Sequence, residues 1–71
     1  MNKEIVEEFY YLALRDLRDG ASIQELELAI AMYEKEEDYE ACEGILRALQ
    51  DSKHLTLENI TQILRNGIRT P

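Results

Sequence analysis

The 71-residue chain is poor in the residues that usually cross-link or bend a small protein. It has one cysteine, one histidine, one proline, three glycines and no tryptophan. Because Cys42 has no second cysteine with which to pair, a disulfide within the chain is excluded, and thiols and imidazoles are too few to close a zinc site. A single core of this size gives a net stability of only about 3 to 5 kcal/mol. Regular helix packing or association must therefore supply what cross-links do not.

Long apolar runs are also missing. No stretch approaches the roughly 18 apolar residues that a membrane span requires. Residues 1–4 lack the apolar stretch of a signal peptide. Together with a free thiol, these features lead us to expect a cytoplasmic protein.

Positive charge is scarce in most of the chain. The net charge is −7, with 15 acidic and 8 basic residues. Residues 1–46 carry −9 and residues 47–71 carry +2. An acidic body repels phosphates and anionic lipids, so we expect no membrane binding, and nucleic acid is disfavoured as a partner.

What the chain does have is helical periodicity, with apolar residues at spacings of three and four. The first such segment predicts a helix over about 3–18, which Gly20 ends in a left-handed conformation. Ser22 and Glu25 form a capping box that predicts the start of a second helix over about 23–36.

The acidic segment 34–43 contains six carboxylates and separates two apolar stripes. If the second helix continued, its stripe would pass through Glu37, Glu40 and Gly44, which is a poor apolar face. A new stripe instead begins after Asp38, a good N-cap, and consists of Tyr39, Cys42, Ile45, Leu46 and Leu49.

This change of phase predicts a turn at 36–38 and a third helix over about 39–50. One continuous helix over 23–50 remains an alternative, because it would align Leu28, Met32, Tyr39, Cys42 and Leu46 on one face.

The last segment predicts a fourth helix over about 57–66, with Thr56 as N-cap, Leu55 as a staple onto Ile60 and Gly67 as the stop. Ile68 is expected to pack back on this helix end, and residues 69–71 form a frayed tail. No segment alternates as a strand does. We therefore predict a single all-α domain over 1–71, a small antiparallel bundle of four short helices.

Catalytic and metal chemistry find little support in the residue pattern. Glu36, Glu40 and Glu43 recur at helical spacing, but neither a calcium loop nor a Glu-x-x-His pair is present. Asp51, Ser52 and His54 share one connector, where adjacent residues rarely reach catalytic geometry. Cys42 is expected to be a core thiol whose pKa the neighbouring Glu40 and Glu43 raise. We therefore expect no enzyme, no cofactor and no metal.

The tyrosines are better suited to an interface. Tyr10 and Tyr11 diverge by about 100° around their helix, so both cannot be central to one face. Tyr33 and Tyr39 flank the predicted turn, where aromatic and acidic side chains combine as they do in protein interfaces. The alternative is that all four tyrosines cover the edge of the core.

A DNA-reading helix would need more basic and amide side chains than the fourth helix has. That segment offers Asn59, Gln62, Arg65 and Asn66, with Lys53 and Arg69 nearby. No glycine-rich phosphate loop or dinucleotide fingerprint is present.

Within 29–49, the acidic-aromatic segment Asp38-Tyr39-Glu40 is followed by a small-residue region and then by an aliphatic and a basic residue. This stretch resembles the short helical hairpin of bacterial excision-repair nuclease subunits, although Glu43 replaces one small residue. It is also similar to the helix-turn-helix of tetratricopeptide units. The resemblance covers under a third of the chain and implies a hairpin used in protein contact, with no activity.

The sequence thus predicts a small acidic protein-binding module that acts by occluding a partner surface. Such a module would be an inhibitor, adaptor or regulator, and a phage or mobile element is a candidate source. Tyr10 or Tyr11 with Met32 and Tyr33 would anchor the contact. A partner with a basic surface would be steered by Glu36, Glu37, Asp38 and Glu40. The 45% hydrophobic content favours self-association. A structural homo-oligomer and an oligomer that encloses a small ligand are the alternatives.

Overall fold

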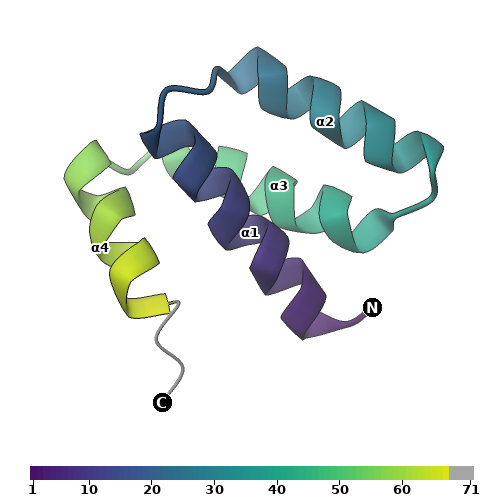
Figure 1. Ribbon diagram of the computed structural model, residues 1–71, viewed down its shortest axis with the longest axis horizontal. Helices are drawn as coiled ribbons and strands as arrows, with labels where there is room; N and C mark the ends of the chain where they lie inside the picture. Colours follow the sequence, from purple (N-terminus) through teal and green to yellow (C-terminus); the bar gives the residue numbers. More distant parts are fainter. Residues whose placement is uncertain (68–71) are drawn as a thin grey trace.

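The computed structural model describes residues 1–67, over which the chain forms four helices and no strand. They are α1 (Lys3–Arg18), α2 (Ile23–Lys35), α3 (Tyr39–Ser52) and α4 (Leu57–Gly67) (Figure 1). The predicted all-α fold is confirmed, and each predicted helix boundary lies within two residues of the observed one. The expectations for Ile68 and for the tail 69–71 lie outside the described residues.

Local hydrogen bonds explain where the helices begin. Asn2 Oδ1 accepts the Glu4 N–H at 2.9 Å. The predicted capping box is present, since Ser22 Oγ accepts the Glu25 N–H at 3.0 Å and Glu25 Oε1 accepts the Ser22 N–H at 3.3 Å. Thr56 Oγ1 accepts the Asn59 N–H at 3.1 Å. Each cap satisfies backbone donors that the first helical turn leaves unpaired.

The turn between α2 and α3 is as predicted, and the alternative of one continuous helix over 23–50 is wrong. Glu37 adopts a left-handed conformation with φ of 60°. The Asp38 N–H returns to the Tyr33 carbonyl at 2.9 Å. Asp38 Oδ1 then accepts the Ala41 N–H at 3.3 Å as the cap of α3. This reversal breaks the helical ladder without a glycine or proline.

The helices alternate in direction along the chain. α2 and α3 form an antiparallel hairpin, α1 crosses α3, and α4 lies beside α1 (Figure 1). The main packing is between α1 and α3, with α2 resting on α3 and α4 resting on α1. Direct contacts between α1 and α2 are few. The α1–α3 pair is therefore the centre of the bundle.

Small residues on α3 allow α1 to approach closely. Ala41 and Ala48 are fully buried, and Gly44 lies between them on the same face. A Cβ on Gly44 would meet the Val6 carbonyl oxygen and would lie 2.7 Å from Phe9 Cβ. The backbone of α1 thus occupies the space that a side chain at residue 44 would need.

The buried face of α3 differs from the predicted stripe. Ile45 and Leu49 are buried as expected, but Tyr39 is 54% exposed and Leu46 is 43% exposed. The expectation that Tyr39 begins the core stripe is therefore wrong. Because α1 packs on the small residues, the buried face is rotated toward Gly44 and Ala48.

The core gathers side chains from all four helices, and Leu14 at its centre is completely buried. Three large apolar residues are exposed at the margins of the core: Leu12 at 41%, Ile23 at 51% and Leu57 at 64%. Within residues 1–67, no helix combines the length and the apolar character that crossing a membrane requires. The central cluster of buried residues consists of Ala13, Leu14, Leu26, Ile45, Ala48, Leu49, Ile60 and Leu64, and Val6 and Ala41 are buried as well.

Candidate functional site

The four carboxylates of the α2–α3 turn have different surroundings. Glu36 and Glu37 are exposed, and no hydrogen bond or ion pair to their side chains is found within residues 1–67. Asp38 is half-buried and caps α3. Glu40 is half-buried and accepts the Asn2 N–H, which joins the beginning of α3 to that of α1. Asp38 and Glu40 therefore support the fold, whereas no such bond is found for the Glu36 and Glu37 side chains within residues 1–67.

The acidic segment does not converge on a single point. Among residues 1–67, no three His, Cys, Asp or Glu side chains lie close enough together to hold a metal ion. The carboxylates spread around the turn and along two helices, which suits a charged surface.

Tyr10 and Tyr11 are both half-buried, with their rings edge to face at a centroid distance of 5.3 Å. The Tyr10 hydroxyl donates to Asp51 Oδ2 at the end of α3. Burial, and then the hydrogen bond and charge of Asp51, raise the pKa of Tyr10. The Tyr11 ring lies directly against Gly67 of α4. These two tyrosines therefore hold α1 against α3 and α4.

Tyr33 and Met32 belong to α2, whereas Tyr11 lies against Gly67 of α4. The Tyr33 ring packs edge to face on Phe9 at a centroid distance of 5.4 Å and is half-buried. Met32 is 67% exposed. The structure thus does not bring the four proposed anchors together: Tyr11 contacts α4, whereas Tyr33 connects α1 with α2.

Asp51 and Ser52, expected in the connector, instead belong to the last turn of α3, and only His54 lies in the connector to α4. Asp51 accepts from Tyr10, and Ser52 Oγ donates to the Leu49 carbonyl at 2.8 Å. His54 is exposed. Asp51 and Ser52 therefore each bond to a different neighbour, and no hydrogen bond between Asp51, Ser52 and His54 side chains is found within residues 1–67.

Cys42 is half-buried between α3 and α2. Its thiol donates to the Ile30 carbonyl at 3.4 Å. Burial raises the pKa of the Cys42 thiol, and the charges of Glu34 and Asp38 raise it further. The direction agrees with the sequence-based expectation, but the responsible carboxylates were named wrongly, because the turn folds Glu34 back toward α3.

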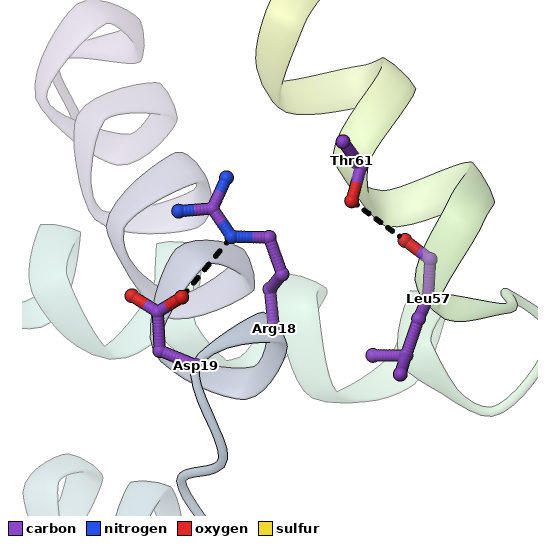
Figure 2. A network of polar contacts seen from close by, with 4 residues as sticks. All are labelled: Arg18, Asp19, Leu57 and Thr61. Atoms are coloured by element: carbon purple, nitrogen blue, oxygen red, sulfur yellow. Dashed lines mark hydrogen bonds and ion pairs between the residues drawn. The ribbon is translucent and has the colours of Figure 1, made fainter.

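Two polar side chains of α4, Asn59 and Thr61, make hydrogen bonds within the helix or with its N-cap. Asn59 completes the cap with Thr56, and Thr61 Oγ1 donates to the Leu57 carbonyl at 2.9 Å. Figure 2 shows this bond together with the Arg18–Asp19 ion pair, in which Nε and Oδ1 are 3.1 Å apart. Arg65 is exposed, and Arg69 lies outside the described residues.

Two large apolar residues of α2, Leu28 and Met32, are exposed, and only Met32 was predicted to be part of an interface. Leu28 and Met32 are 66% and 67% exposed and lie four residues apart on the outer face of α2. Two neighbouring hollows also open between α1 and α2, with volumes of about 190 and 510 Å³. Sequence periodicity signals an apolar flank on α2, but a hollow between two helices depends on their spacing, which periodicity does not specify.

Comparison of the chain with protein-family models, curated proteins and solved structures found no match.

Proposed function

We propose that this chain is an acidic, cytoplasmic protein-binding module that docks on a partner with a basic surface and occludes that surface. The observation that carries the proposal is the exposure of Leu28 and Met32 on the outer face of α2. Water contact with large apolar side chains is unfavourable, and clustered exposure of this kind is typical of interaction surfaces. Glu27 and Glu34 are exposed on the same helix. An apolar centre with an acidic rim suits a basic partner.

In the proposed mechanism, the acidic turn attracts the basic partner electrostatically and so speeds association, which we call steering. Glu36 and Glu37 follow α2 directly and are exposed. Unpaired carboxylates at the rim of an interface act mainly on the association rate, whereas buried apolar anchors act mainly on dissociation. The two groups of residues are therefore expected to give different kinetic signatures.

The steering part is tested by capture of a partner from host lysate, followed by association kinetics at low and high salt. Glu36→Lys combined with Glu37→Lys should slow association by on the order of tenfold and flatten its salt dependence. The matched control, Glu7→Lys with Glu8→Lys, changes the net charge equally on α1. Equal effects of the two pairs would remove the turn from the mechanism.

The anchoring part is tested with Leu28→Ala and Met32→Ala on the same captured partner. Because both side chains are about two-thirds exposed, the melting temperature should change little while dissociation becomes faster. Leu57→Ala is the control, since Leu57 is 64% exposed on α4. Unchanged dissociation in both α2 variants, or failure to capture any basic protein, would contradict the proposal.

A symmetric homo-oligomer is the second candidate. It is supported by further apolar exposure on α3, at Tyr39 and Leu46. It is opposed by the net charge of −7 on each copy, which makes like surfaces repel. Light scattering at micromolar concentration and low salt distinguishes the two, because a strict monomer under these conditions excludes the homo-oligomer.

A further inference from the structure

The sulfur atoms of this chain belong to Met1, Met32 and Cys42, and they have different surroundings. Met32 is 67% exposed on α2, and Met1 is 76% exposed ahead of α1. Cys42 is half-buried between α3 and α2. An oxidant dissolved in water must touch the sulfur atom, so exposure decides which sulfur it reaches first. The two thioethers are therefore accessible, whereas the thiol is partly shielded.

The Cys42 thiol is also held in its less reactive form. It donates a hydrogen bond to the Ile30 carbonyl at 3.4 Å. Burial, and then the charges of Glu34 and Asp38, raise the pKa of Cys42. Peroxides oxidise a thiolate in preference to a thiol, so a raised pKa slows oxidation of the cysteine. The thioether of Met32 carries no proton, and its reactivity does not depend on such an ionisation.

Met32 differs from Met1 in the surface to which it belongs. Met32 lies in the last turn of α2, four residues after Leu28, which is 66% exposed on the same face. Met1 precedes α1 and belongs to no helix. An oxygen atom added at residue 32 therefore changes the polarity of the Leu28–Met32 face, whereas one added at residue 1 does not.

We propose that Met32 is a modification site at which a peroxide makes the apolar face of α2 polar and so weakens docking. The Met32 Sδ lone pair attacks one oxygen of hydrogen peroxide, the O–O bond breaks, and water is released as the S–O bond forms. The thioether is oxidised to a sulfoxide while the peroxide is reduced, and methionine sulfoxide reductases reverse the change. Weaker docking rests on the proposed function, whereas the oxidation of Met32 in preference to Cys42 does not.

The fold is expected to survive this modification. Met32 is exposed and lies outside the central cluster of buried residues, so a sulfoxide there displaces no core packing. The melting temperature should therefore change by less than about 4 °C, as it does for a surface substitution.

The test treats the folded chain with hydrogen peroxide at neutral pH and locates the added oxygen by peptide mass spectrometry. Oxidation of Met32 is expected well before oxidation of Cys42. Retention on a phenyl column, which reports exposed apolar surface, should fall after oxidation and recover after treatment with methionine sulfoxide reductase. Circular dichroism follows the melting temperature.

Met32→Leu and Met1→Leu are matched variants that each remove one oxidisable sulfur. Peroxide should lower the retention of Met1→Leu clearly more than that of Met32→Leu, because only Met1→Leu keeps the thioether beside Leu28. Oxidation of Cys42 before Met32, equal loss of retention in the two variants, or unfolding of the oxidised chain would overturn the assignment.

Docking is measured on the captured partner, with each variant compared before and after oxidation. Dissociation from Met1→Leu should become about tenfold faster, because a buried methionine side chain contributes at least that much to binding, whereas dissociation from Met32→Leu should not change. An unchanged rate for oxidised Met1→Leu overturns the weakening of docking and leaves the proposed function intact. Failure to capture a partner contradicts the proposed function, while the mass spectra and column retention decide the modification separately.

Discussion

The Tyr10 hydroxyl donates a hydrogen bond to Asp51 Oδ2 across 2.5 Å, which joins the middle of α1 to the last turn of α3. The residues are 41 positions apart in the chain. The bond lies between α1 and α3, and the Tyr10 ring also packs edge to face against the Tyr11 ring. It holds a tyrosine that sequence reasoning had assigned to a partner interface.

Tyr10→Phe should lower the free energy of unfolding by about 1 kcal/mol. The substitution removes one hydrogen bond to a carboxylate while keeping the ring in place, and bonds of this kind contribute on that order in partly exposed sites. Urea denaturation followed by circular dichroism measures the change. Tyr39→Phe is the control, because the Tyr39 ring is 54% exposed, and no hydrogen bond of its hydroxyl is found within residues 1–67. Equal losses in the two variants would contradict the assignment.

The same tyrosine predicts a loss of stability in alkali. The pKa of Tyr10 is raised in the folded chain above the unfolded value of about 10, so the folded state retains the phenolic proton when the unfolded state has lost it. The resulting stability is complete below pH 10 and falls as the pH rises above it. Denaturation between pH 8 and about 11 should show this decline in the unmodified chain. A decline of the same steepness in Tyr10→Phe would assign it to other groups.

Gly44→Ala should destabilise the fold by about 1 to 3 kcal/mol. An added Cβ would meet the Val6 carbonyl oxygen and would lie 2.7 Å from Phe9 Cβ, so α1 and α3 would have to separate. At an open helical site the same change adds up to about 1 kcal/mol of stability, because alanine favours the helix. The sign of the change in thermal and urea unfolding therefore reports directly on whether the two backbones are in contact.

Glu37→Gly should stabilise the chain by about 0.5 to 1 kcal/mol. Glu37 has a φ of 60°, a conformation that costs a residue with a side chain more than it costs glycine. Glu36→Gly removes the same charge one residue earlier, where φ is −88° and glycine relieves no strain. That control should lose about 0.5 to 1 kcal/mol through the greater freedom of the unfolded chain. Matching signs in thermal denaturation would argue against the left-handed turn.

The helix boundaries and the α2–α3 turn could be predicted because they depend on interactions within a few residues. Ser22 with Glu25, and Asp38 with Ala41, satisfy backbone donors no more than three positions away. The exposure of Glu36 and Glu37 likewise follows from their place in a turn rich in charge.

The candidate anchors could be predicted only in part, because residue type does not say which helix lies opposite. Met32 is exposed as an interface residue would be, whereas Tyr10 faces Asp51 and Tyr11 faces Gly67. The hollows between α1 and α2 were missed for the same reason. The smaller one is lined by Ala13 and Ile45, which are far apart in the chain and share no sequence pattern.

The amino-acid sequence by itself determined the number of helices over residues 1–67, their caps, the turn and the acidic surface, since capping and periodicity act locally. Only the tertiary structure decided which face of α3 is buried. Apolar periodicity favoured Tyr39 and Leu46, but α1 can approach α3 most closely over Gly44. Two backbones that approach closely make more van der Waals contacts than two protruding side chains would allow, so the small residues of α3 face inward and Tyr39 and Leu46 are exposed.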